Sequence, residues 1–434
     1  MIGIQGGESL GSWYGTNESA LYIRRLVELC AKYGKIIHEA DGCYDENKWL
    51  EIYQDTCTAN LIQKYKSHIV FSQKNNIFNK QLFTQSALFG MYLAGAIENT
   101  GAWEDGGWYW AQVGFKKLGE STGARTGELF DMPPIFWDLT FLMGLSRGAT
   151  VFSMDGQGGV LMRGHYDPTN PKHRNQVLWS AEGEVTETFT RYVAPFLRAV
   201  VIHKMFVSKE ELLKKVKVGV TYEGVNEIKV FKEDRYREFW PLFKGTYGFG
   251  TQGSSRGEVY EYFPNTGRYF FIPVLPPVEN KLSDKIIRVP INKLQDPQQV
   301  TDFFNANYPE SYKGNALVYQ VGDILAIMNT HENEDVTENY AVPLNRGNFN
   351  SISGKINVHS YIMGKFENKN KQLWLQVNTN YPERNSEFAI ACSAEPKVKV
   401  VPAEAIKICK WDAIKKELVV ELDHTAGAVE LTLY

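Results

Sequence analysis

The sequence predicts an α/β domain followed by an all-β domain. In the first half of the 434-residue chain, short apolar runs alternate with helix-length segments, which is typical of parallel strands joined by helical crossovers. From about residue 285, strand-length segments with apolar residues at every second position favour a β-sandwich. A stretch rich in Gly, Tyr and Pro separates the two textures. We place the domain boundary near residue 280, within the range 215–290, which gives domains 1–280 and 281–434.

The opening segments predict alternating strands and helices. The run IGIQGG predicts a short buried strand, followed by a helix over about residues 17–33 that Gly34 ends. KIIHEADG predicts the next strand, and a helix over about residues 45–65 follows it. ALFGMYLAGAIENTG is strand-like at its end and runs into the loop AWEDGGWYW.

The alternation continues to about residue 221. MPPIFWDLTFLMGLSRG predicts a helix, with Pro in its first turn and Gly at its close. ATVFSMDGQGG predicts another buried strand, and a helical region over about residues 186–215 leads into the strand KVGVTYEG. The strands number about five, near residues 2, 36, 92, 150 and 217, which is too few to close an eight-stranded barrel. An open doubly wound sheet is the alternative, although no Walker loop is present to support a nucleotide site.

The second half predicts a hairpin and several further strands. NALVYQVGDILAIMNT predicts two strands joined at Gly322 and Asp323. Strand-length segments follow in KINVHSYIMGKF, KQLWLQVNT, SEFAIACSA and KKELVVELDHTAGAVELTLY. Together they favour a sandwich of two sheets.

Composition excludes several classes of function. A net charge of -3 argues against a protein that neutralises nucleic-acid phosphates. No run of 18 apolar residues is present to span a membrane, and the sequence shows no signal peptide. The five cysteines are an odd number without CxxC spacing, which argues against a disulfide scaffold and against a zinc site.

Four consecutive predicted strands of the first half share one feature, which is that each ends in carboxylates. In parallel α/β proteins the carboxyl ends of the strands form one face, where active sites assemble. We therefore expect acids from different strands to converge on one cleft. These acids are Glu8, Glu39, Asp41, Glu98, Glu104, Asp105 and Asp155.

Clustered carboxylates fit two chemistries. In glycoside hydrolysis one carboxylic acid protonates the leaving oxygen while a second carboxylate activates water or attacks directly. In metal catalysis the same acids would hold Mg²⁺ or Ca²⁺ through oxygen ligands. The aromatic content of 13% favours the first, because sugar rings stack on indole faces. The tryptophans beside the acids, which we expect to bind substrate, are Trp13, Trp103, Trp108 and Trp110.

Four further side chains are candidates for binding substrate. Glu39 and Asp41 follow the second predicted strand, where His38 either lines the cleft or has a structural role. Tyr247, in KGTYGFG, is placed to reach over the cleft. The histidines show no HExxH spacing, so a zinc protease is not supported.

Several longer phrases resemble the family 98 glycoside hydrolases. They are MPPIFWDLTFLMGLSRGATVFSMDG, PLFKGTYGF and YEYFPNTGRYFFIPVLP, and the resemblance covers nearly the whole chain. It implies a (β/α)8 TIM-type barrel followed by a C-terminal β-sandwich. It also implies endo-acting hydrolysis with inversion of the anomeric centre. The family includes endo-β-1,4-galactosidases that release blood-group oligosaccharides and a branch that cleaves xylan.

The resemblance also implies roles for the acids. Glu8, in GIQGGES, matches the family's general acid, and the base candidates are Asp155 with either Glu98 or Asp105. The final strand offers Asp155 where the resemblance leads us to expect Glu, which retracts the carboxylate by about one methylene. Since the general acid belongs on the fourth of eight strands, we expect the barrel to be incomplete at its N-terminus.

The resemblance implies an oligosaccharide or polysaccharide substrate, no cofactor and no metal. We expect a monomer at the bacterial cell surface or outside the cell, whose signal peptide was lost with the first part of the barrel. Two alternatives stay open at this point. One is a non-catalytic carbohydrate-binding protein derived from such an enzyme, and the other is a metal-dependent hydrolase.

Overall fold

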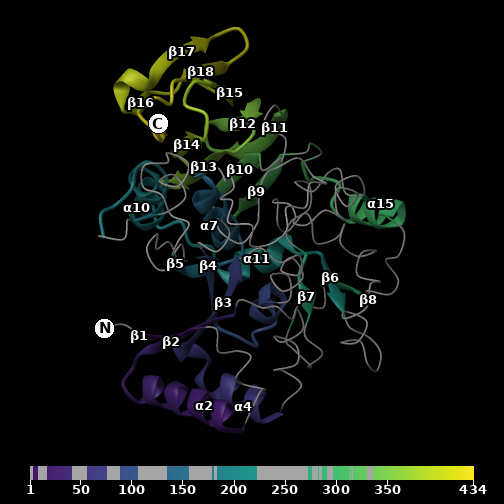
Figure 1. Ribbon diagram of the computed structural model, residues 1–434. Coiled ribbons are helices and arrows are strands. Elements are labelled where there is room, and N and C mark those ends of the chain that lie inside the picture. The colour runs from purple at the N-terminus through teal and green to yellow at the C-terminus, as the bar shows by residue number, and fades with distance from the viewer. Residues whose placement is uncertain are drawn as a thin grey trace.

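A computed structural model of the chain describes residues 3–7, 17–41, 56–75, 88–105, 134–155, 178–179, 183–221, 272–275, 282, 286–290, 297–312, 314, 316–329 and 336–434. The first half contains a five-stranded parallel sheet with strand order β1-β2-β3-β4-β5 (Figure 1). Its strands are β1 (Gly3–Gly7), β2 (Ile36–Asp41), β3 (Ile69–Asn75), β4 (Asn99–Asp105) and β5 (Ala149–Asp155). The predicted parallel α/β architecture is confirmed.

Helices cross between successive strands of this sheet. They are α2 (Asn17–Lys32), α4 (Thr56–Tyr65) with the 3-10 turn η1 (Lys66–His68), and α7 (Phe136–Ser146). Helix α2 buries Val27 and Cys30 and ends before Gly34, whose φ of 60° suits glycine, as predicted. Helices α2 and α4 lie together at one end of the molecule, and α7 lies on the side nearer the β-sandwich (Figure 1).

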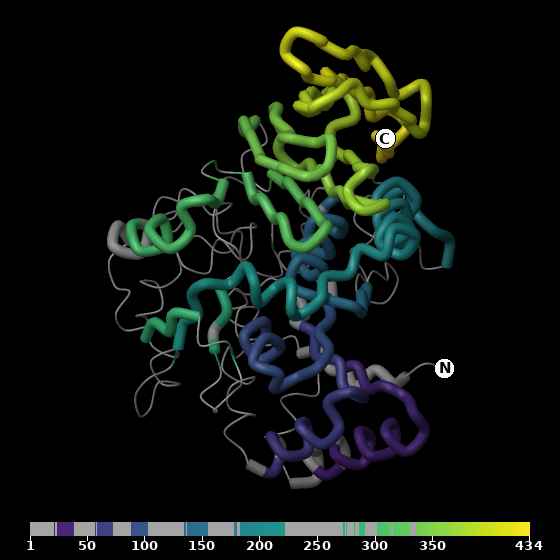
Figure 2. Tube along the Cα trace, turned by 180° about the vertical axis from the view of Figure 1, so that it is seen from behind, coloured from purple at the N-terminus to yellow at the C-terminus, as the bar shows by residue number. Residues whose placement is uncertain are grey.

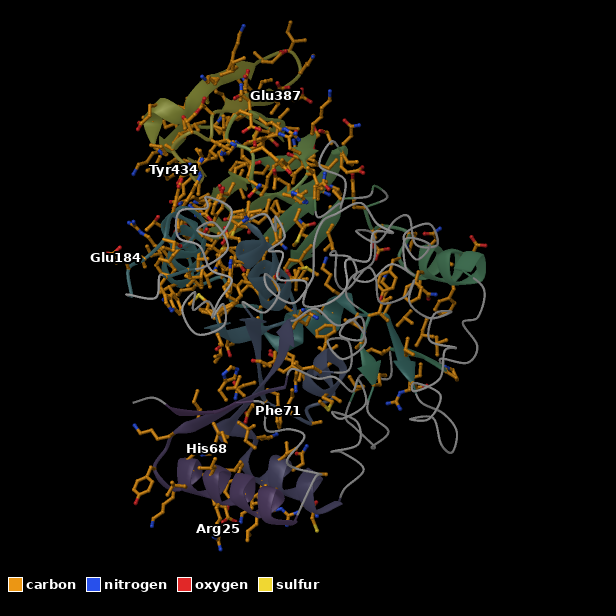
Figure 3. The ribbon with its side chains drawn as sticks, viewed as in Figure 1. Arg25, His68, Phe71, Glu184, Glu387 and Tyr434 are labelled. Atoms are coloured by element: carbon orange, nitrogen blue, oxygen red, sulfur yellow. The ribbon has the colours of Figure 1, made fainter. Side chains whose placement is uncertain are left out.

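One predicted strand of the first half is wrong. Residues 88–93 are helical, and the strand of this region is β4, which begins at Asn99. A strand that was not predicted, β3, precedes them and occupies the centre of the sheet. Phe71 of β3 is buried, and Figure 3 shows it toward the end of the molecule that holds α2 and α4, away from Glu387 and Tyr434 in the sandwich.

The predicted helical region that follows divides into the π-helix η2 (Phe189–Val193), α10 (Ala194–Ile202) and α11 (Lys209–Lys215). Ser208 caps α11, because its Oγ accepts a hydrogen bond from the backbone of Glu211. A three-stranded parallel sheet of order β7-β6-β8 comes next, formed by β6 (Val218–Thr221), β7 (Val274–Leu275) and β8 (Ile287–Pro290). This sheet joins residues on both sides of position 280.

The last part of the chain is a β-sandwich. One sheet has the order β16-β19-β14-β13-β10-β9 and the other β11-β12-β15-β18-β17. Helix α15 (Pro297–Asn307) precedes them, and the 3-10 turn η6 (Ala403–Ala405) lies within them. The strands are β9 (Leu317–Val321), β10 (Ile324–Asn329), β11 (Thr337–Arg346), β12 (Phe349–Asn357), β13 (Ser360–Glu367), β14 (Gln372–Thr379), β15 (Ser386–Cys392), β16 (Val398–Val401), β17 (Ile406–Asp412), β18 (Glu417–Leu422) and β19 (Val429–Leu433).

The predicted hairpin at Gly322 is confirmed, since Val321 pairs with Ile324 across the turn. The segment KINVHSYIMGKF is not one strand. It divides between β12 and β13 at His359, whose φ of 51° turns the chain.

Two hydrophobic cores organise the molecule, and the six-stranded sheet contributes to both. Side chains between the two sandwich sheets, such as Ile327 and Ile362, form one core. The alternate residues, such as Met328 and Tyr361, pack into a core shared with the first half of the chain. Helices α7 and α10 lie between this sheet and the parallel sheet (Figure 2). The sandwich is therefore buried on one outer face.

Candidate active site

The carboxyl ends of the five parallel strands form the edge at which the predicted acids stand. Strands β4 and β5 end at Asp105 and Asp155, which are register partners. Strand β2 ends at Asp41, and β1 ends at Gly7, the residue before Glu8 in the sequence. Backbone topology alone thus brings acids from distant parts of the sequence to one edge of the sheet.

Glu98 does not share this edge. It is exposed and directly precedes β4, whose first residue is Asn99 and whose last is Asp105. A strand rises about 3.3 Å per residue, so Glu98 lies roughly 23 Å along the strand from Asp105. The prediction that Glu98 follows the end of a strand is therefore wrong, because the helix at residues 88–93 was taken for that strand.

A close approach between three strands lies beneath the carboxyl edge. Ser72 of β3 is fully buried, and its register partner on β4 is Gly101. A Cβ at Gly101 would collide with Ser72 Oγ and would lie 2.9 Å from the backbone oxygen of Val151 on β5. Glycine is therefore required at this position of β4 for the three strands to keep their spacing.

His38 of β2 completes this arrangement. Its Nε2 lies 2.6 Å from Ser72 Oγ, and only 8% of the residue is exposed. Desolvation by burial lowers the pKa of His38 to about 4, so the imidazole is neutral at physiological pH. The structure favours the structural role for His38, because the side chain is buried and hydrogen-bonded between β2 and β3.

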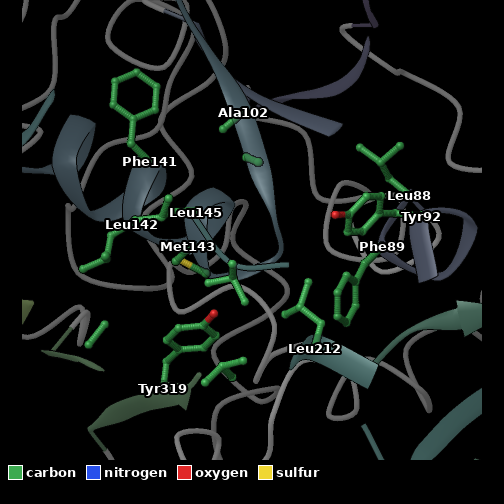
Figure 4. Packing of buried hydrophobic residues seen from close by; sticks show 14 of the residues in the cluster. Leu88, Phe89, Tyr92, Ala102, Phe141, Leu142, Met143, Leu145, Leu212 and Tyr319 are labelled. Carbon is green, nitrogen blue, oxygen red and sulfur yellow. The ribbon is translucent and has the colours of Figure 1, made fainter. Parts of the chain in front are cut away.

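Helix α7 holds β4 and β5 from the other face of the sheet. Gly144 of α7 packs directly against Ala102 of β4, leaving no room for a larger residue. Phe141 of α7 meets Phe152 of β5 edge to face, with ring centroids 5.4 Å apart. Figure 4 shows the apolar side chains of α7 between Ala102 and Tyr319 of the sandwich strand β9. The strands that end in Asp105 and Asp155 are thus fixed by a helix that also contacts the sandwich.

Comparisons with known proteins identify the family. A model of glycosyl hydrolase family 98 matches residues 1–203, and a model of the glycosyl hydrolase family 98 C-terminal domain matches residues 209–389. Together the two models span most of the chain. The chain belongs to glycoside hydrolase family 98.

Solved structures agree with this assignment. One is the catalytic module of a family 98 glycoside hydrolase from Streptococcus pneumoniae TIGR4 in complex with the H-disaccharide blood group antigen. It has a TM-score of 0.72 and 20% sequence identity over 100% of this chain and 79% of that chain. The same module in complex with the LewisY pentasaccharide blood group antigen has a TM-score of 0.70 and 20% identity, over 97% of this chain and 77% of that chain. A search of curated protein sequences found no match.

Membership of family 98 confirms two predictions. The chain is a glycoside hydrolase, and its fold is that of the family's catalytic module, a barrel-type α/β domain joined to a C-terminal β-sandwich.

Several predicted site residues of this family 98 chain lie outside the described residues. They are Glu8, Trp13, Trp108, Trp110 and Tyr247. For another group the structure gives the strand position, which is in β2 for Glu39 and Asp41, in β4 for Trp103, Glu104 and Asp105, and in β5 for Asp155.

Sequence reasoning missed Ser72 and Gly101. The signal for Gly101 was a glycine inside a strand, which marks the close approach of another chain segment. It was hidden because the strand was placed too early in the sequence.

Among the described residues no group of three or more His, Cys, Asp or Glu side chains is placed to hold a metal ion. In the same part of the chain, no helix is both long and apolar enough to cross a membrane.

Proposed function

We propose that this family 98 chain is an endo-acting, inverting glycoside hydrolase that cleaves internal β-1,4 bonds in blood-group-type glycans. The observation that carries this proposal is the register pairing of Asp105 with Asp155 at the carboxyl edge of a parallel sheet. A pair of neighbouring carboxylates can hold one water molecule between them and take its proton.

Glu8 is the proposed general acid. It follows β1, which is three strand positions from β4 in the sheet. Neighbouring strands lie about 4.8 Å apart, so three steps cover about 14 Å along the sheet. Barrel curvature and the length of two side chains shorten this separation toward the roughly 6.5–9.5 Å that an inverting enzyme needs between acid and base. We propose Asp105 and Asp155 as the base pair, which their register pairing supports, and the position of Glu98 before β4 argues against Glu98.

Each acid has a distinct chemical task. Glu8 must hold a proton near neutral pH, which neighbouring carboxylates and apolar surroundings favour by raising a carboxyl pKa. One of Asp105 and Asp155 takes the proton of the attacking water, while the other orients that water. Attack from the face opposite the leaving oxygen inverts the anomeric centre.

Blood-group-type glycans are the proposed substrate class because the similar structures hold an H-disaccharide and a LewisY pentasaccharide. Xylan is the alternative substrate that a direct comparison tests. The wild-type protein is expected to release oligosaccharides from a blood-group-type glycan and to leave arabinoxylan intact. Release from arabinoxylan alone would overturn the assignment.

Three variants test the assignment of roles. Asp105→Asn and Glu8→Gln are each expected to lower kcat on the glycan by about 10²–10⁴-fold, the usual contribution of a general acid or base. Glu8→Gln should lose far less on a glycosyl fluoride, because fluoride departs with little protonation. Glu98→Gln is the matched control and should keep wild-type activity. A Glu98→Gln variant as inactive as Asp105→Asn would refute the base assignment, and binding without turnover by the wild type would refute the activity.

We also propose a monomer at the bacterial cell surface or outside the cell, with an activity that EDTA does not remove. The division between domains 1–280 and 281–434 is best moved to about residue 290. Strand β8 ends at Pro290 and pairs with β6, so a cut at 280 would split that sheet. Limited proteolysis that cleaves near 290 and spares 280 would support this boundary.

A further inference from the structure

A buried polar cluster joins the first half of the chain to the sandwich. Asp138 stands in the first turn of α7, Tyr361 on β13 and Gln376 on β14, and all three have no exposed surface. The Tyr361 hydroxyl oxygen lies 3.1 Å from Asp138 Oδ2 and 3.0 Å from Gln376 Oε1. One hydroxyl thus bridges an acid of the barrel domain and an amide of the sandwich.

The orientation of the Gln376 amide is fixed by its other partner. Its Nε2 lies 3.3 Å from the backbone oxygen of Pro195 in α10. A backbone carbonyl only accepts hydrogen bonds, so the atom that faces Pro195 must be the nitrogen donor. The atom that faces Tyr361 is therefore the amide oxygen, which also only accepts.

Counting hydrogens then determines the protonation state of Asp138. The Tyr361 hydroxyl has a single hydrogen but lies within hydrogen-bond distance of two oxygens. If Asp138 were ionised, one of these contacts would bring two acceptors together in a buried site. If Asp138 carries a proton on Oδ2, it donates to Tyr361, and Tyr361 donates to Gln376. Both contacts are then hydrogen bonds.

We propose that Asp138 is a neutral carboxylic acid whose proton joins α7 to the β-sandwich, and that Asp138 is a positioning residue for strands β4 and β5. The sandwich then acts as a brace for the catalytic domain. The positioning role of Asp138 in catalysis rests on the proposed function, because it assumes that Asp105 and Asp155 act at the ends of β4 and β5.

The surroundings of Asp138 agree with a neutral group. Complete burial raises the pKa of Asp138 well above its ordinary value, and the Tyr361 hydroxyl and the Asn378 amide offset only part of this shift. Asp138 Oδ1 has no hydrogen-bond partner among the described residues, which is far costlier for a carboxylate than for a neutral carbonyl.

Few charged groups face the cluster. Tyr361 and Tyr192 are the titratable neighbours, and burial raises the pKa of both. Glu430 of β19 acts on Tyr361, and Arg191 acts on Tyr192. Asp138 and Tyr192 interact electrostatically. No cation among these groups forms an ion pair with Asp138 in the described part of the chain.

Further contacts join the sandwich to η2 and α10 in the first half of the chain. Lys365 of β13 donates from Nζ to the backbone oxygens of His203 and Lys204 at the end of α10, both at 2.7 Å. Arg191 of η2 donates to the backbone oxygen of His424 at 2.7 Å. The ring of Phe196 meets that of Tyr361 edge to face at 6.3 Å. Of the contacts named here, the bond between Asp138 and Tyr361 is the one that depends on a carboxyl proton.

Proton linkage provides the test. An unfolded chain releases the Asp138 proton above about pH 4, whereas the native chain keeps it. The wild-type unfolding constant should therefore rise about tenfold per pH unit relative to that of Asp138→Asn, from about pH 4.5 until the native acid ionises. The Asn amide keeps the hydrogen bond to Tyr361 but cannot titrate. Asp302→Asn, which changes an exposed acid on α15, is the matched control and should not reproduce this slope.

Either of two results would overturn the proposal. One is a ratio of the wild-type unfolding constant to that of Asp138→Asn that does not change with pH. The other is a ratio that falls as the pH rises, which is the behaviour of an acid that is ionised in the native state. If Asp138→Asn does not fold, infrared spectroscopy of the wild type and of Tyr361→Phe takes its place. A neutral-carboxyl C=O band at pH 7 that shifts in Tyr361→Phe supports the neutral acid, and its absence from the wild type refutes it.

Activity provides a second readout that is separate from protonation. Asp138→Ala is expected to lower kcat by about tenfold to a hundredfold through displacement of β4 and β5, and Asp138→Asn should rescue most of this loss. If the pH slope appears without the kcat effect, the neutral acid stands and the positioning role is refuted. Since unfolding is measured without substrate, failure of the proposed glycosidase activity leaves the proton test intact.

Discussion

Replacing Gly101 by alanine tests directly how strands β3, β4 and β5 pack beneath the carboxyl edge of the parallel sheet. The added Cβ would collide with Ser72 Oγ and would lie 2.9 Å from the backbone oxygen of Val151. The Val151 oxygen belongs to the backbone of β5 and cannot rotate away. Ser72 can rotate, but only by giving up its hydrogen bond to His38, at 2.6 Å.

The magnitude follows from these two responses. Overpacking a buried site costs about 1–3 kcal/mol. Loss of the bond between Ser72 and His38 adds about 1 kcal/mol. We therefore expect Gly101→Ala to lower the free energy of unfolding by about 2–4 kcal/mol. Because Asp105 stands four residues further along the same strand, kcat should fall as well.

Denaturant unfolding of four proteins provides the measurement. They are the wild type, Gly101→Ala, Ser72→Ala and the double variant. Removing Ser72 Oγ relieves the worse of the two collisions, so the double variant should be more stable than the sum of the single effects by at least about 1 kcal/mol. The close approach between β3 and β4 would be refuted if Gly101→Ala lowered the free energy of unfolding by less than about 0.5 kcal/mol. It would also be refuted if the effects of Gly101→Ala and Ser72→Ala were strictly additive.

Two other predictions concern acid stability and the junction with the sandwich. The pKa of His38 is lowered from 6.5 to about 4, so the unfolded chain binds this proton first as the pH falls. Stability present above about pH 6.5 should be lost between about pH 6.5 and 4, by about 3 kcal/mol, and His38→Gln should remove this loss in denaturant titrations. An equal acid sensitivity in the variant would contradict the buried neutral imidazole. Lys365→Met keeps the apolar stem but removes two hydrogen bonds to the end of α10, and thermal unfolding should show a loss of about 2–4 kcal/mol. Unchanged unfolding would mean that Lys365 does not hold the helix.

Much of the fold could be predicted from local patterns. Helix α2 and strand β2 follow from apolar spacing and from Gly34, and the hairpin of β9 and β10 follows from alternation around Gly322. These elements have one apolar face or a distinct turn, so their period shows in the sequence.

The segment at residues 88–93 was predicted to be a strand but is a helix, and the apolar pattern did not distinguish the two because the whole segment is buried. Leu88, Phe89, Met91, Tyr92 and Leu93 are all buried, so the helix has no polar stripe to reveal its period. Placing a strand there displaced β4, which in turn brought Glu98 into the candidate site. One error in secondary structure thus carried over into the expected position of Glu98.

The contact between Asp138 and Tyr361 could not be predicted, since 223 positions separate the two residues. The sequence did contain a hint, which is a single carboxylate inside the apolar helix FWDLTFLMGLS. A buried acid requires a partner, but only the folded chain shows that the partner comes from the sandwich.

The configuration of the first product tests the central claim most directly. Proton NMR during hydrolysis of a blood-group-type glycan with an internal β-1,4 bond distinguishes the α anomer from the β anomer before mutarotation mixes them. An acid at Glu8 and a base pair at Asp105 and Asp155 predict that the α anomer appears first. A β anomer that appears first would contradict this account, because retention requires two carboxyl groups only about 5–5.5 Å apart and a covalent intermediate.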